Sequence, residues 1–197
     1  MSSSTPLEYT TLARRIERLE ARAEIRELVA RYCFAVDGRD VEGIGECFTR
    51  GGAFRSYDGK MDAIGRAAVI DQFHGRFAVL GPSNHFTHDQ IVTFDDSDAA
   101  CATGLVNAHA EVVRNGRPLI TSLRYHDEYR IEEGRWRFHV RTLAFFYYVE
   151  PQRYHEVMLG TLRNEAYPVA HPADFPRTAA GKVRKADLRA KLDAAGP

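Results

Sequence analysis

The sequence lacks an excess of charge of either sign. It contains 27 basic and 27 acidic residues, so its formal net charge at neutral pH is zero. Proteins that bind nucleic acid or anionic lipid through their overall field carry a clear basic excess. We therefore expect neither a nucleic-acid partner nor a membrane partner, and a small-molecule substrate becomes the favoured class of ligand.

Long hydrophobic runs and paired cysteines are also missing. No apolar run approaches the roughly 20 residues of a membrane span. The first six residues show no basic region followed by an apolar core, as a secretory signal would. The three cysteines, Cys33, Cys47 and Cys101, are odd in number and far apart, which suggests neither a disulfide framework nor a zinc pattern. These absences predict a protein of the reducing cytoplasm.

The remaining composition is that of a globular protein. With 197 residues and 44% hydrophobic content, the chain is long enough for one domain with a sizeable core. We expect this domain in residues 1–150 and a C-terminal extension in residues 151–197. The extension is predicted to be partly helical, over residues 154–167 and more weakly over residues 181–197.

The first half of the domain has helical periodicity. Residues 9–37 fit two helices or one bent helix, and residues 42–48 fit a short helix capped by Asp40. A short strand is expected at residues 53–57, and a third helix from residue 65 or 66 to about residue 80. The apolar stripe of the first segment repeats every three or four residues, at Ile25, Leu28, Val29, Tyr32, Cys33 and Val36.

The second half changes to alternating hydrophobicity. Four long strands are expected, at residues 85–95, 100–114, 119–132 and 135–148, and Asn115-Gly116 is a strong hairpin signal. The pattern predicts an α+β fold, in which N-terminal helices cover a curved antiparallel sheet. A sheet that is curled in this way forms a cone, and a cone has a natural pocket.

Asp37 follows the apolar stripe of the first helix at the position where another core residue is due. Burial disfavours the charge of a carboxylate, and so does the negative end of a helix dipole. A solvent-facing acid at the end of the helix is one explanation. The other is a functional acid paired with a partner, and His85, which begins the first long strand, could be that partner. A carboxylate bonded to one imidazole nitrogen would make the other nitrogen a better general base.

Other polar and aromatic residues at inward-facing positions are weaker candidates. Arg141 in the last strand would either bind an anionic group in an aromatic pocket or form a structural salt bridge. No pair of histidines has a recognised metal spacing, so we predict neither a metal site nor a cofactor. The remaining candidates for the wall of the cavity, each of which could equally be a core or rim residue, are Tyr32, Phe54, Tyr57, Asn107, His109, Tyr125 and Phe145.

The order of these segments resembles the NTF2-like superfamily, and in particular its SnoaL-like branch, which includes dehydratases and a dehydrochlorinase. The resemblance spans about residues 20–149. It rests on residues 25–32 (Ile-Arg-Glu-Leu-Val-Ala-Arg-Tyr), 37–40 (Asp-Gly-Arg-Asp), 83–87 (Ser-Asn-His-Phe-Thr), 124–129 (Arg-Tyr-His-Asp-Glu-Tyr) and 134–141 (Gly-Arg-Trp-Arg-Phe-His-Val-Arg). It implies an NTF2-like cone in which Asp37 and His85 form an acid–base dyad, with Tyr32 and Arg141 as further catalytic residues.

The resemblance and the residues together favour a cofactor-independent lyase that acts on a cyclic, largely apolar molecule. An isomerase or cyclase of a polyketide, aromatic or terpenoid pathway would use the same groups. A non-catalytic scaffold, such as the small subunit of ring-hydroxylating dioxygenases, is the other alternative, because one fold hosts many functions. The aromatic run at residues 145–148 would present one face to the pocket and the other to a subunit interface, in a dimer or trimer.

Overall fold

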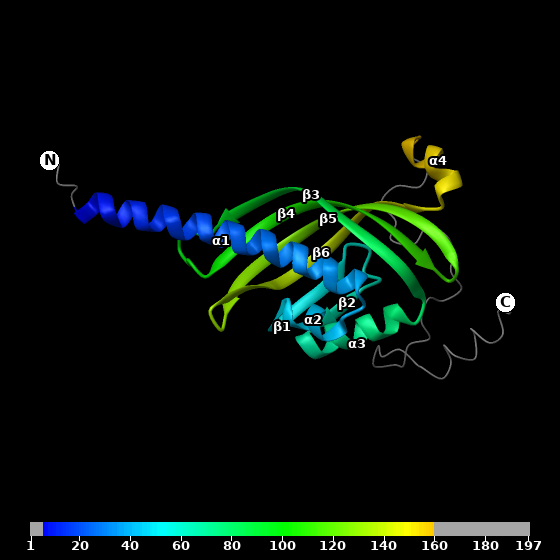
Figure 1. The fold of residues 1–197 in the computed structure, drawn as a ribbon, viewed down its shortest axis with the longest axis horizontal. Helices are drawn as coiled ribbons and strands as arrows, with labels where there is room; N and C mark the ends of the chain where they lie inside the picture. The colour runs from blue at the N-terminus through cyan, green and yellow to red at the C-terminus, as the bar shows by residue number, and fades with distance from the viewer. Residues whose placement is uncertain (1–5, 160–197) are drawn as a thin grey trace.

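Helices cover one face of a curved six-stranded sheet in the computed structural model, which describes residues 6–159 (Figure 1). This arrangement confirms the predicted α+β class. The elements are α1 (Pro6–Asp37), α2 (Val41–Glu46), β1 (Phe48–Ser56), β2 (Asp62–Ile64), α3 (Arg66–Phe77), β3 (Leu80–Phe94), β4 (Cys101–Arg114), β5 (Arg117–Glu132), β6 (Arg135–Val149), η1 (Pro151–Arg153) and α4 (Tyr154–Met158).

The sheet has the strand order β2-β1-β6-β5-β4-β3. Strands β3 to β6 form the predicted antiparallel meander. Its two tight turns contain Asn115 and Glu133 with φ of 49° and 55°, each followed by a glycine, which suits the twist of a hairpin. The prediction of a wholly antiparallel sheet is wrong, because β1 pairs with β6 in parallel. No hairpin joins these two strands, so their relative direction is set by the path of the chain through β2, α3 and the strands β3 to β5.

Several boundaries differ from the sequence prediction. Helix α1 is one continuous helix, β1 begins at Phe48, where a helix was expected to end, and the short strand β2 was not predicted. Strand β3 begins at Leu80, so the segment expected to break the chain, residues 81–83, belongs to the strand. Helix α4 covers only the start of the helix expected at residues 154–167. Residues 160–167 and 181–197 lie outside the described residues.

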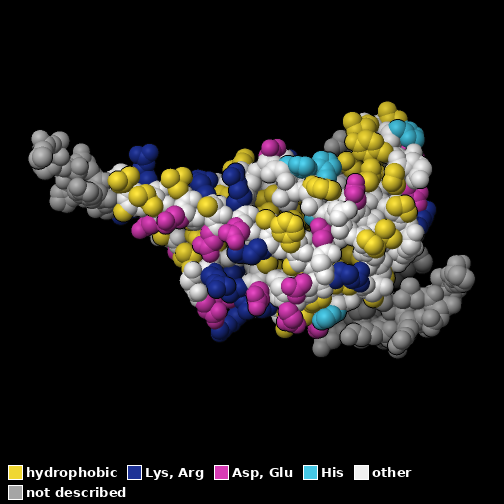
Figure 2. Space-filling view, viewed as in Figure 1, with side chains coloured by type: hydrophobic (Ala, Val, Ile, Leu, Met, Phe, Trp, Pro, Cys, Tyr) yellow, Lys and Arg dark blue, Asp and Glu magenta, His cyan; other side chains and the backbone are white. Residues whose placement is uncertain are grey.

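The apolar stripe of α1 packs onto the concave face of the sheet. All six of its members are at most 7% exposed. They pack with a set of aromatic side chains that fill the interior, namely Phe48, Phe54, Phe73, Tyr125 and Phe138. The first half of α1 extends beyond the sheet, and Leu12, Ile16 and Leu19 are exposed there (Figure 1). Basic and acidic side chains are mixed over the molecular face shown in Figure 2, with no large area of one sign.

The aromatic run near the end of β6 divides between the two faces of the sheet. Phe145 and Tyr148 belong to the main core, whereas Tyr147 and Val149 form a second cluster with Val157 of α4. Helix α4 therefore covers part of the convex face. Within residues 6–159, no helix combines the length and apolar character that a membrane crossing requires.

Candidate functional site

Asp37 and His85 meet where the last turn of α1 faces the first half of β3. The Asp37 Oδ1 atom lies 2.6 Å from His85 Nδ1, and Asp37 Oδ2 accepts a hydrogen bond of 2.8 Å from the His85 backbone N–H. The two side chains are 23% and 13% exposed, so the pair is shielded but not sealed. An ionised carboxylate can only accept, so Nδ1 donates and the lone pair of a neutral imidazole is on Nε2.

Ser83 completes the hydrogen bonding of the acid. Its hydroxyl donates to Asp37 Oδ1 at 2.8 Å. Burial by itself raises the pKa of Asp37, but the hydrogen bonds from His85 and Ser83 outweigh this effect and hold the pKa below its ordinary value. Asp37 is therefore a carboxylate at neutral pH. The Nε2 atom of His85 makes no hydrogen bond to residues 6–159, which leaves it available to a ligand.

Arg39 connects the two chain segments that carry the pair. This residue follows α1 in the left-handed region, with φ of 58°. Its guanidinium donates to the carbonyl oxygens of Leu80 at 2.6 Å and Phe77 at 2.5 Å, and it lies 4.8 Å from the centre of the Phe77 ring. The end of α1 is thus bound to the start of β3, which fixes Asp37 relative to His85.

Arg141 lies deeper in the cone and has a partner that the sequence did not reveal. It forms two hydrogen bonds with Asp127 of the neighbouring strand, Nε to Oδ1 at 2.9 Å and Nη2 to Oδ2 at 2.8 Å. Both side chains are fully buried. Tyr129 also donates to Asp127 Oδ2, at 2.8 Å, whereas Nη1 of Arg141 is buried without a hydrogen-bond partner. Coulombic attraction from Asp127 outweighs desolvation and raises the pKa of Arg141, so its charge is permanent.

Aromatic rings enclose this guanidinium. Its central carbon lies 4.5 Å from the ring centre of Tyr32, 4.0 Å from that of Tyr125 and 3.9 Å from that of Phe138. Such contacts favour a cation over the ring face. Burial raises the pKa of Tyr32 and of Tyr125, so both hydroxyls stay protonated.

Phe54 and Phe145, two of the predicted wall residues, also face this side of the sheet. Both belong to the main core, and Phe54 lies in the group of rings around Tyr32. Cys33 belongs to the same buried core. Burial raises the pKa of its thiol to about 11, so it remains neutral.

Three predicted site residues, His109, Asn107 and Tyr57, lie on the opposite side of the sheet from the dyad. In β4, His109 pairs with Phe86 and Ala110 pairs with His85, so His109 lies on the sheet face opposite to the His85 side chain. Asn107, two residues earlier, shares this face and accepts a hydrogen bond from Arg124. Tyr57 is 66% exposed and packs edge-on against His126, which is on the same convex side.

The convex face has its own histidine pair. The Nε2 atom of His88 lies 2.9 Å from Nδ1 of His109. Burial lowers the pKa of His109, and the neighbouring His88 lowers it further. Two imidazoles alone make an incomplete metal site, and residues 6–159 contain no group of three metal-ligating side chains with the required geometry.

Ser83 and Asp127 were not predicted as site residues, although the sequence contains a signal for each. Residues two apart in a strand share a face, which places Ser83 with His85 and Asp127 with Tyr125. Ser83 was assigned to a chain break, so strand parity was not applied to it. The pairing of Asp127 with Arg141 depends on the register of β5 against β6, which places these two residues opposite each other.

Comparisons with known proteins agree with this architecture. A model of the SnoaL-like domain matches residues 17–142. No curated protein matches the chain. Similar solved structures include a hexachlorocyclohexane dehydrochlorinase, LinA type 3, from Novosphingobium barchaimii, with 17% identity, coverage of 68% of this chain and 92% of that chain, and a TM-score of 0.61.

Two further structures have comparable similarity. A scytalone dehydratase-like protein from Novosphingobium aromaticivorans is 18% identical, with coverage of 69% and 91% and a TM-score of 0.63. Rv3472 from Mycobacterium tuberculosis, a protein of unknown function, is 23% identical, with coverage of 98% and 94% and a TM-score of 0.59. At these identities the three structures show the shared fold and nothing finer.

Proposed function

Because the chain belongs to the SnoaL-like family, we propose that it is a cofactor-independent lyase that removes a proton from a cyclic, largely apolar small molecule and expels a leaving group. The observation that carries this proposal is the 2.6 Å contact between His85 Nδ1 and Asp37 Oδ1. The dehydrochlorinase and the dehydratase-like protein among the similar structures support an elimination. The aromatic residues of the cone suit an apolar ring.

His85 is the base in the proposed reaction. Its Nε2 lone pair takes a proton from a carbon next to a carbonyl group, and Asp37 stabilises the imidazolium that results. The electrons of the broken C–H bond form a carbon–carbon double bond, and the leaving hydroxide departs with its own bonding pair. The imidazolium then returns the proton to this hydroxide, which gives water and regenerates neutral His85.

Arg141 and Tyr32 support the negative charge that develops on the substrate. The guanidinium is permanently charged in a dry environment, where electrostatic stabilisation is strong. Its Nη1 atom is the nitrogen that has no hydrogen bond to the described residues. Tyr32 lies over the same guanidinium, and its protonated hydroxyl is the second donor of the proposal.

The test is proton exchange and elimination on a panel of cyclic hydroxy-ketones. In D₂O, the wild-type protein should replace the α protons of the substrate with deuterium and release water. NMR and mass spectrometry measure both changes. His85→Ala should lower both rates by roughly 10²–10⁴-fold, the range for loss of a general base. His109→Ala, on the opposite face, is the matched control and should retain the wild-type rates. Equal rates for wild type and His85→Ala would reject His85 as the base.

An isomerase or cyclase uses the same first step and is separated by its product. In that case α-proton exchange still depends on His85, but the substrate keeps its leaving group. An isomerase moves a double bond of the substrate, and a cyclase forms a new ring. The NMR spectra of the exchange experiment identify either product directly.

A non-catalytic scaffold is the second candidate function, and the packing of the interior favours it. Tyr32 and Tyr125 are each at most 3% exposed, and together with Phe54 they are part of the main core of the cone. A scaffold predicts no exchange on any substrate and the same affinity for its partner in wild type and His85→Ala.

We also expect the chain to assemble with itself, as a dimer or trimer. The support is the exposed stripe of Leu12, Ile16 and Leu19 on the first half of α1. Leu19→Glu should shift the mass measured by light scattering toward that of the monomer, whereas Arg55→Glu, on β1, should leave it unchanged.

A further inference from the structure

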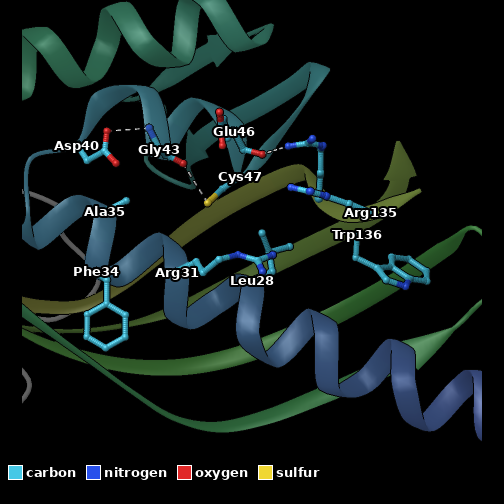
Figure 3. A pocket seen from close by; sticks show the side chains of 11 residues that line it. Leu28, Arg31, Phe34, Ala35, Asp40, Gly43, Glu46, Cys47, Arg135 and Trp136 are labelled. Carbon is cyan, nitrogen blue, oxygen red and sulfur yellow. Dashed lines mark hydrogen bonds between the residues drawn. The ribbon is translucent and has the colours of Figure 1, made fainter. Parts of the chain in front are cut away.

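A groove separate from the dyad lies where α1, α2 and the start of β6 meet (Figure 3). Its volume is about 420 Å³, within the range of small-molecule sites. Neither Asp37 nor His85 lines it. Whatever binds in this groove does not compete directly with a substrate at the dyad.

The inner surface of the groove is apolar. Leu28, Cys47 and Trp136 line it, and each is at most 5% exposed. Phe34 lies at one end and Trp136 at the other (Figure 3). Phe34 is 78% exposed, and covering such a ring with a ligand removes apolar surface from water, which is favourable. These surfaces suit the flat body of an aromatic ligand.

Guanidinium groups provide the polar part of the groove. Arg137 has a side chain that is only 12% exposed. Its Nη1 donates to the Glu46 carbonyl oxygen, but its Nε is buried with no hydrogen-bond partner. The nearest carboxylate oxygens, of Glu132 and Glu133, are 4.0 Å and 3.9 Å from its guanidinium nitrogens, beyond hydrogen-bond distance. A buried donor without an acceptor is costly, so the charge of Arg137 is incompletely balanced by these two acids.

Neighbouring charges favour an anion. Arg135 lines the groove and is exposed, and its side chain has no ion pair or hydrogen bond with any residue in 6–159. Arg31 pairs with Glu27 at 3.3 Å in an exposed contact, which is a weak interaction. Asp40 and Glu46 are the two acids of the lining, against the three arginines Arg31, Arg135 and Arg137, and Asp40 already caps α2 through a 2.9 Å hydrogen bond from the Gly43 N–H.

We propose that this groove binds a small aromatic carboxylic acid. The ring lies between Phe34 and Trp136, over Leu28 and Cys47. The carboxylate accepts from the exposed Arg135 guanidinium, in the charge-assisted manner that planar guanidinium groups favour, and lies beside the charge of Arg137. The site is independent of the proposed lyase chemistry, because the two sets of residues do not overlap.

Trp136 makes the proposal directly measurable, because it is the single tryptophan of the chain. The full-length protein is titrated with 4-nitrobenzoate, which quenches tryptophan fluorescence, and with uncharged 4-nitrobenzamide. The acid should quench along a saturable curve, and the amide should bind at least ten-fold more weakly. Linear quenching of equal strength by both compounds would overturn the proposal.

Variants decide where the probe binds. Arg135→Ala should lower the affinity for 4-nitrobenzoate at least ten-fold. Arg117→Ala, which removes an exposed arginine at the opposite end of β5, should leave this affinity unchanged. His85→Ala should leave the titration unchanged. Equal affinities of Arg135→Ala and Arg117→Ala, or loss of binding in His85→Ala, would refute the proposed site. Arg135 is a surface side chain, and circular dichroism confirms that its variant is folded.

Discussion

Two carboxylates on the concave side of the sheet are paired with cations, or potential cations, in different ways. Asp37 meets His85 through one side-chain contact in a partly exposed position. Asp127 meets Arg141 through two hydrogen bonds, and neither side chain is exposed. A histidine can exchange a proton near neutral pH, whereas an arginine in a protein stays charged.

The first pair can transfer a proton, whereas the second holds a fixed positive charge in the interior. The Asp37 pair has a ring nitrogen left for a ligand, enough exposure to reach one, and a partner that can change its charge. The Asp127 pair is enclosed by aromatic rings and cannot change its charge. Burying two ions is expensive, and only the mutual contact compensates for this cost. Substitutions at the deep pair should therefore have their largest effect on stability, whereas substitutions at the dyad should mainly affect turnover.

The largest expected effect is on stability at the deep pair. Arg141→Met should reduce the free energy of unfolding by about 3–5 kcal/mol, because Asp127 is left buried without its cation. Urea unfolding followed by circular dichroism measures the change. The double variant Arg141→Met with Asp127→Leu should recover part of the loss, since no charge then remains. A loss below about 1 kcal/mol in the single variant would contradict the description of this pair as structural.

At the dyad, Asp37→Asn should mainly affect turnover. An asparagine has nearly the same volume but no charge to stabilise an imidazolium, so proton exchange should fall by roughly 10²–10⁴-fold. The free energy of unfolding should change by less than in Arg141→Met, because the position is partly exposed. Exchange rates and urea unfolding are measured on the same preparation. A variant that unfolds as readily as Arg141→Met but exchanges normally would reverse the comparison.

Ser83→Ala tests the support of the dyad. Loss of a hydrogen bond to an ionised group should cost about 1.5 kcal/mol and raise the pKa of Asp37, since that bond helps to lower it. The carboxyl pKa is measured by NMR, independently of any substrate. Ser83→Thr keeps the hydroxyl and should restore both values; an unchanged pKa in Ser83→Ala would argue against the positioning role.

The smallest effect is the dependence of stability on pH through Asp37. Its pKa is lower in the folded protein than its ordinary value of 3.8. The unfolded chain therefore binds the proton more readily, and the contribution of Asp37 to stability is present above pH 3.8 and lost as the pH falls through the folded pKa. The difference in unfolding free energy between wild type and Asp37→Asn should thus shrink below about pH 4. If the difference in unfolding free energy instead grew as the pH fell, the pKa of Asp37 would be raised, not lowered, in the folded protein.

Much of the fold was accessible from sequence because the signals are local. The buried stripe of α1 follows the spacing from Ile25 to Val36, and the meander follows strand alternation with a turn at Asn115. The proximity of Asp37 and His85 was expected from the family resemblance together with their places at the end of a helix and in a strand. The catalytic roles of these residues remain predictions.

Other features depend on relations between distant segments. No local pattern shows that β1 runs parallel to β6, since the connection passes through several other elements. Asn107 and His109 were candidates for the pocket because alternation shows only that they share a face. The pairing of Ala110 with His85 decides that this face is the convex one.

By itself the sequence determined the periodic elements, the tight turns and the acid at the end of α1, because spacing along the chain and residue chemistry control them. The tertiary structure decided which charges meet. Strand register placed Asp127 opposite Arg141, and the Arg39 contacts connected the end of α1 to the start of β3. Hydrogen bonds form over about 3 Å, so a shift of one residue in a strand would exchange the partners that distinguish the deep pair from the dyad.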